Sequence, residues 1–240
     1  MALPKLNTIE YFCKLPVSGI EAKYRPFTVG EQKVLLQALE DGDTKTVSHT
    51  VINLVDSCST LEGDYTIRDL ANTDLEYLFL QTRIKSVGEK TKVILGCDKQ
   101  PECDGTTEVE VDINEIEVTG KIGDPKVMIT DTVGVNLRVP SFRDVTDIMG
   151  KKAEIGTAEI FTILTRSIES IFDENDVHQR ADFSDKELQE FIDELNLEQF
   201  NHMMEWFQDL PKLTKNVEYA CSKCGNPNKM LLEGIQNFFA

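Results

Sequence analysis

The sequence predicts an α+β fold with helices in both the N-terminal and C-terminal parts of the chain and an antiparallel β region between them. Apolar residues recur at helical spacing before Thr91, alternate with polar residues after it, and return to helical spacing after Pro140. A period near 3.6 residues is typical of an amphipathic helix, and a period of two is typical of a half-buried strand. At 240 residues, the chain is long enough for one large domain or two small ones.

The N-terminal part is predicted to be an extended arm followed by three helices. The first 27 residues are expected to be extended because they contain four residues that interrupt helices, Pro4, Pro16, Gly19 and Pro26. Thr28 and Glu31 have the spacing of a capping box, in which each side chain accepts a hydrogen bond from the other residue's backbone. Two more helices are expected over residues 44–58 and 73–88.

The central part is predicted to consist of two β hairpins. In the first, Lys92–Leu95 has the composition of a strand, and Thr107–Ile113 alternates between polar and apolar residues. In the second, Lys126–Thr130 and Val133–Val139 flank a candidate turn. The middle of the chain is therefore expected to be antiparallel β structure.

The part that follows Pro140 is predicted to be helical. Capping signatures begin at Ser141 and Ser184, and a partner helix is expected over residues 200–210. A polar loop is expected over residues 173–182. A long helix is expected before this loop because four isoleucine and leucine residues form an apolar stripe: Ile160, Leu164, Ile168 and Ile171.

Four segments follow from these patterns. Residues 1–90 form an N-terminal extended arm and helical unit, residues 91–140 a central β region, and residues 141–215 a helical part. Residues 216–240 are expected to form a strand, a knuckle, a second strand and a short apolar helix. We predict that this C-terminal knuckle packs on the central β region.

The cysteines provide a candidate metal site. Cys221 and Cys224 form a C-x2-C-G knuckle, a spacing that lets two thiolates bind one ion. Cys97 and Cys103 lie between the two strands of the first hairpin and are the candidate second pair. Zinc prefers four ligands in a tetrahedron, so the sequence predicts a structural zinc ion in a ribbon-like site of four cysteines that joins distant parts of the chain.

Two other interpretations of the cysteines stay open. The four thiols can be reduced packing residues, or the C-x2-C pair can be redox active. A redox role requires a strand leading into a helix start, whereas this motif lies between two short strand-like segments. The remaining two cysteines, Cys13 and Cys58, lie far from any partner motif and are interpreted as packing residues.

Composition argues against several classes of partner and activity. The formal net charge is −17, which disfavours nucleic acid because sequence-independent binding depends on Lys and Arg neutralising phosphates. No apolar run approaches the 18 residues that a membrane span needs, and the N-terminus does not have the pattern of a signal peptide. The sequence contains no glycine-rich phosphate loop, H-E-x-x-H pair or G-x-S-x-G elbow. We therefore predict a protein that is not an enzyme and has no catalytic residues.

Several segments carry a family resemblance. They are Tyr24–Leu36, Asp74–Leu80, Arg83, Ser86–Glu89 and the Gly-x-x-x-Phe-Phe sequence over 234–239. In these segments the chain resembles the T4-type phage baseplate protein family, which includes the baseplate hub subunit and the hub assembly protein. The resemblance is strongest over residues 24–97.

The resemblance implies a structural or assembly component of the baseplate hub of a contractile phage tail. Its partners would be other phage baseplate and tail proteins, and its location the virion tail baseplate after assembly in the host cytoplasm. Two alternatives are a transient hub assembly chaperone absent from the mature virion, and a zinc-ribbon protein in transcription or nucleic-acid handling.

Three residues within the matching segments are interface candidates: Arg25, Phe27 and Arg83. Arginine and aromatic residues are enriched at the energetic centres of protein interfaces. The alternative is that the two arginines form ion pairs within the chain, with Glu31, Asp74 or Glu76 as partners.

Overall fold

The computed structural model describes residues 8–146 and 157–234, and it divides the chain into two compact units. The first unit contains Met1–Ile67, Thr73–Thr119 and Lys212–Ala240. The second unit contains Arg68–Asn72 and Gly120–Pro211. The first unit is thus assembled from the two ends of the chain and a middle segment.

The N-terminal part of the first unit contains strands as well as helices. Strands β1 (Tyr11–Lys14), β2 (Glu21–Tyr24) and β3 (Ser59–Leu61) form an antiparallel sheet in the order β1-β2-β3. Helices α1 (Val29–Asp41) and α2 (Thr44–Cys58) lie between β2 and β3 in sequence. The prediction of a purely helical unit after an extended arm was therefore wrong in part, because the extended residues pair with one another and with β3.

The predicted start of the first helix is confirmed, whereas helix α3 (Asn72–Val87) begins before Thr73, which was expected to cap it with Glu76. The Thr28 hydroxyl accepts from the Glu31 amide, and the Glu31 carboxylate accepts from the Thr28 amide. Helix α1 ends at Gly42, which has the left-handed conformation that glycine tolerates best. A short 3-10 turn, η1 (Ile67–Asp69), leads to helix α3. Helix α3 supplies much of the core, and Phe79 on it is 1% exposed.

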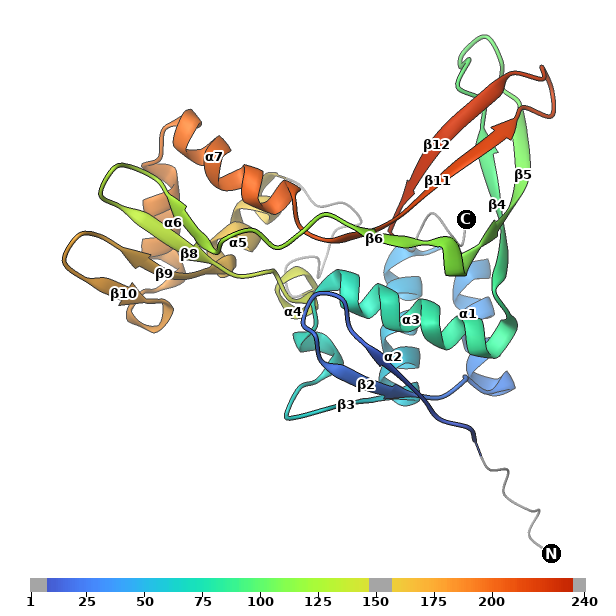
Figure 1. Cartoon of the computed structure of the whole chain (residues 1–240), viewed down its shortest axis with the longest axis horizontal. Helices are drawn as coiled ribbons and strands as arrows, with labels where there is room; N and C mark the ends of the chain where they lie inside the picture. The colour runs from blue at the N-terminus through green and yellow to red at the C-terminus, as the bar shows by residue number, and fades with distance from the viewer. Residues whose placement is uncertain (1–7, 147–156, 235–240) are drawn as a thin grey trace, which may run out of the picture. The chain divides into compact units, whose positions relative to one another are not determined.

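Two hairpins complete the first unit (Figure 1). One is β4 (Lys90–Gly96) with β5 (Thr106–Asp112), and it is followed by the 3-10 turn η2 (Ile113–Glu115). The other is β11 (Lys212–Ala220) with β12 (Pro227–Glu233), and β6 (Glu117–Thr119) pairs on the far side of β11. The two hairpins lie side by side and bury a shared apolar core that includes Val93, Leu95, Val111, Val217 and Leu232.

In its described residues, the second unit combines a four-stranded antiparallel sheet with four helices. The sheet order is β10-β9-β8-β7, and the strands are β7 (Lys126–Met128), β8 (Gly134–Leu137), β9 (Ile168–Phe172) and β10 (Val177–Gln179). The helices are α4 (Phe142–Thr146), α5 (Thr157–Ser167), α6 (Asp185–Asp193) and α7 (Leu197–Gln208), with the 3-10 turn η3 (Arg180–Asp182) before α6. Their core includes Leu137, Leu188, Met203 and Trp206.

Two predictions for residues 141–215 were wrong. The expected long helix ends at Ser167, and Ile168 and Ile171 lie on strand β9. Isoleucine suits a strand as well as a helix, and here antiparallel pairing with β8 and β10 decides the conformation. The expected loop over 173–182 contains strand β10 and turn η3. The C-terminal helical part is therefore a mixture of helices and strands.

Other predictions for this half of the chain are confirmed. Ser184 and Glu187 form the expected capping box of α6, and β7 and β8 form the expected second hairpin. The short apolar helix predicted at the C-terminus lies outside the described residues. None of the described helices combines the length and the apolar character needed to cross a membrane.

Candidate metal centre

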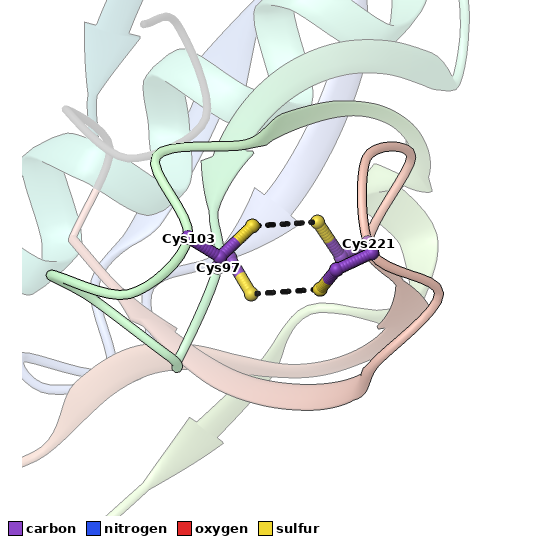
Figure 2. A group of neighbouring side chains, drawn as sticks. Cys97, Cys103 and Cys221 are labelled. Carbon is purple, nitrogen blue, oxygen red and sulfur yellow. Dashed lines mark hydrogen bonds between the residues drawn. The ribbon is translucent and has the colours of Figure 1, made fainter.

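The candidate site consists of four cysteine sulfurs at the ends of the two hairpins of the first unit. Cys97 and Cys103 lie between β4 and β5, and Cys221 and Cys224 lie between β11 and β12. The Sγ atoms of Cys97 and Cys224 are 3.7 Å apart, and those of Cys103 and Cys221 are 3.8 Å apart. Figure 2 shows the labelled side chains of Cys97, Cys103 and Cys221 pointing toward one another from the two turns. All four sulfurs lie within 4.8 Å of one another.

The arrangement of the sulfurs fits a tetrahedral ion. A zinc–thiolate bond is about 2.3 Å long, so the edges of a regular tetrahedron of four sulfurs measure about 3.8 Å. The two sulfur–sulfur distances of 3.7 and 3.8 Å match this edge. Disulfide sulfurs would be about 2.05 Å apart, and all four cysteines are free thiols. The donor set therefore fits zinc, with four protein ligands and no position for a substrate.

The β11–β12 turn orients its two sulfurs through its backbone. The Gly225 amide donates to the Cys221 carbonyl at 2.8 Å, and the Cys221 amide donates to the Asn226 carbonyl at 2.8 Å. Gly225 has φ +71°, a conformation that other residues rarely adopt. The C-x2-C-G spacing thus encodes a tight turn with both thiols on its inner side.

Gly105 is a site residue that sequence reasoning missed. A Cβ atom at this position would lie 2.8 Å from the Cys221 Sγ and 2.7 Å from the Lys223 Cβ. Both distances are well below an ordinary van der Waals contact distance. Only glycine therefore lets the β4–β5 turn and the β11–β12 turn approach this closely. The signal in the sequence was a glycine two residues after Cys103, which parallels the glycine that follows Cys224.

Hydrogen bonds between the two hairpins hold the turns in register. The Ser222 amide donates to the Thr107 hydroxyl at 2.9 Å, and the Ser222 hydroxyl donates to the Thr106 carbonyl at 2.6 Å. On the other side, the Asp98 amide donates to the buried Asn228 side chain at 3.2 Å. Sequence reasoning missed Asn228, whose role depends on contacts with residues about 130 positions away. Such bonds orient the turns that carry the thiols.

The electrostatics of the turn favour a thiolate at Cys221. Hydrogen bonds from the backbone amides of Cys224 and Lys223 lower the pKa of Cys221 to about 6. At Cys97, a backbone hydrogen bond from Lys99 favours the thiolate, but burial and the neighbouring thiols raise its pKa to about 12. Four sulfurs this close cannot all ionise without a cation among them, because like charges repel. A bound metal ion would supply that charge.

Cys13 and Cys58 lie outside the cluster. Cys58 is 3% exposed and packs in the core of the first unit. Burial raises the pKa of Cys58, and burial together with the Asp74 carboxylate raises that of Cys13 to about 11. A raised pKa keeps a thiol protonated and unreactive, which agrees with the interpretation of both cysteines as packing residues.

The interface candidates make contacts within the first unit. Two nitrogens of Arg25 donate to the Glu31 carboxylate at 3.0 and 2.8 Å, which confirms the ion pair expected as the alternative. Arg83 donates to the carbonyls of Gly88 and Lys90. Phe27 is 8% exposed, so its ring is largely covered. Contacts of these residues with another protein stay a prediction.

Replacing Arg25 by alanine should lower the free energy of unfolding by about 1.5–3 kcal/mol, the usual contribution of hydrogen bonds to a charged group. The Arg25 guanidinium is the main reason that the pKa of Glu31 falls from 4.5 to about 2. Because this pKa is depressed, the stabilisation is present above pH 4.5 and is lost as the pH falls toward 2. Urea denaturation at several pH values measures both effects.

The exposed Arg68 makes a matched control for this substitution. Arg68→Ala removes the same charge and should change stability by less than about 0.5 kcal/mol. An Arg25→Ala protein with the stability and acid sensitivity of the native chain would show that the ion pair contributes nothing.

The fold and the site together define a mixed α and β protein in which four of the six cysteines form a cluster between two hairpins. A family model described as T4 bacteriophage base plate protein matches residues 8–240. The chain therefore belongs to this family, and the resemblance seen in the sequence is confirmed. No curated protein and no solved structure matches the chain. Membership gives the chain a structural role in the baseplate of a phage tail, among other baseplate and tail proteins.

Proposed function

We propose that this chain is a structural subunit of the baseplate hub, the central part of a contractile tail, and acts through protein contacts without catalysing a reaction. The observation that carries the proposal is the family match over residues 8–240, which covers nearly the whole chain. The closed cysteine cluster supports it, because a metal ion with four protein ligands has no open position for catalysis.

We propose further that Cys97, Cys103, Cys221 and Cys224 bind zinc, and that the ion is a structural part of the hub subunit. The sulfur–sulfur distances and the backbone donors around Cys221 support this assignment. The ion would join a turn near the middle of the sequence to a turn near its end. Metal binding then contributes directly to the folding free energy of the first unit.

A transient assembly chaperone is the principal alternative, and it differs from a structural subunit in one measurable respect. A chaperone leaves after the hub forms, whereas a subunit remains in the particle. A zinc-ribbon protein of transcription is less consistent with the chain, because its net charge of −17 opposes binding to phosphates.

Quantitative mass spectrometry of purified virions tests the proposed function. We expect peptides of this chain at a fixed ratio to a known tail protein, unchanged after further purification on a density gradient. A phage protein that acts only during assembly serves as the negative control. Absence of this chain from complete particles, with its presence in infected cells, would contradict the proposal and favour the chaperone.

A further inference from the structure

The second unit contains a cleft of about 730 Å³ that is rich in arginine. The whole sequence contains seven arginines, and four of them line this cleft: Arg138, Arg143, Arg166 and Arg180. They come from strand β8, helix α4, helix α5 and turn η3 or from the residues next to them. In a chain with a net charge of −17, this concentration of guanidinium groups needs a physical explanation.

One of the four arginines, Arg138, is held by several hydrogen bonds within the unit. Arg138 donates to both oxygens of Asp144 at 2.7 and 3.0 Å, and to the Arg166 carbonyl at 2.7 Å. Asp144 is 8% exposed. Burial by itself raises the pKa of Asp144, but hydrogen bonds from Arg138 and Ser141 outweigh this effect and hold the pKa below its ordinary value. The pair is therefore ionised, and its hydrogen bonds hold the Arg138 side chain as part of the cleft lining.

Arg143 and Arg180 are partly exposed, and each pairs with an aspartate. Arg143 pairs with Asp69 at 2.8 Å, and its side chain is 53% exposed. Arg180 donates to the Phe183 carbonyl at 2.8 Å and pairs with Asp185, and its side chain is 34% exposed. A guanidinium group has five N–H donors. In the described part of the chain, Arg180 uses two of them, which leaves donors for a further acceptor.

We propose that this cleft is a docking site for a carboxylate-bearing segment of another baseplate protein. The planar guanidinium group binds carboxylates through paired hydrogen bonds, and arginine is enriched at the energetic centres of protein interfaces. A volume of about 730 Å³ is within the range of sites that enclose a small ligand, so it suits one or two side chains or a chain terminus. The identity of the partner rests on the proposed function.

The charges in the cleft favour a carboxylate over a nucleic-acid backbone. Asp144, Glu169 and Asp185 also line the cleft and offset most of the arginine charge. A nucleic acid presents a continuous row of phosphates and needs an extended basic surface. A single carboxylate needs only one or two guanidinium groups, with the neighbouring acidic side chains holding them in place.

Site-specific photocrosslinking in assembled baseplates tests the proposal. Ala181 is exposed and lines the cleft, so p-benzoylphenylalanine can replace it with little effect on the fold. The complete chain carrying this residue is supplied to a phage that lacks its own copy. Baseplates are then purified and irradiated, and the crosslinked peptides are identified by mass spectrometry.

We expect a crosslink to a segment of another tail protein that contains Asp, Glu or a C-terminal carboxylate. Adding Arg180→Gln should lower its yield at least tenfold. Arg68→Gln removes the same charge from the exposed Arg68 in the same unit and outside the cleft, and it should change the yield less than twofold. Thermal unfolding of both variants shows whether each retains its fold.

Four results would overturn the proposal: a crosslink to nucleic acid, a crosslink to a segment without a carboxylate, no crosslink in purified baseplates, or a yield unaffected by Arg180→Gln. A negative result in the crosslinking experiment contradicts the docking site without contradicting the proposed function. If virions contain the chain but its cleft gives no crosslink that depends on Arg180, the hub role stands and only the docking site is wrong.

Discussion

Replacing Cys221 by serine is expected to remove the bound zinc and to destabilise the two paired hairpins of the first unit by several kcal/mol. Structural zinc in zinc-finger peptides contributes on the order of 10 kcal/mol of binding free energy, and that energy is available only to the folded hairpins. Elemental analysis of the purified protein should find about one zinc per native chain and far less in Cys221→Ser. Hydrogen exchange should then show faster exchange in the β4–β5 and β11–β12 hairpins.

Cys13→Ser is the matched control, because Cys13 belongs to the same unit but lies outside the cluster. It should retain the metal. Gly105→Ala is a sharper second variant: it keeps all four thiols, but its methyl group would overlap the Cys221 sulfur. We expect weaker zinc binding in Gly105→Ala, measured by competition with a chelator. A native protein without zinc, whose hairpins exchange as slowly after chelation as before, would contradict the metal assignment.

The parts of the fold that the sequence predicted correctly are those encoded locally. The capping boxes at Thr28 and Ser184 were recognisable because each depends on two side chains three residues apart and on their own backbone. The C-x2-C-G knuckle was recognisable for the same reason. Strand β9 was not, because Ile168 and Ile171 satisfy a helical period as well as a strand, and only pairing with β8 and β10 decides between them.

In the candidate site too, features encoded locally in the sequence were predictable and features that depend on distant contacts were not. The four cysteines could be proposed as one set because zinc chemistry requires four ligands, and the structure brings their sulfurs together. Gly105 and Asn228 have a role in the site only because the β4–β5 turn contacts the β11–β12 turn. This contact joins residues more than 100 positions apart in the sequence. The arginine-lined cleft was likewise not predictable, since its four arginines are spread over more than 40 residues of sequence.

Trp206→Ala is expected to destabilise the second unit by about 3–5 kcal/mol, the usual cost of truncating a large aromatic side chain in a core. Trp206 is 8% exposed, and its ring lies edge-on to Phe207 with the centroids 5.0 Å apart. Alanine would leave a cavity in the core that Leu188 and Met203 share. Urea denaturation followed by circular dichroism measures the change, and zinc content should be unaffected because the cysteines belong to the first unit.

Trp206→Phe distinguishes the contribution of ring packing to stability from the contribution of the buried indole N–H group. The indole Nε1 is buried and finds no acceptor among the described residues, so its hydrogen-bonding group costs free energy when it is buried. Phenylalanine keeps most of the apolar contact and removes that group. The two effects oppose each other, and we expect Trp206→Phe to cost less than about 1.5 kcal/mol. If phenylalanine instead destabilises the unit as much as alanine does, the indole N–H group forms a hydrogen bond when the protein is in solution. The core of the second unit then depends on that hydrogen bond as well as on apolar packing.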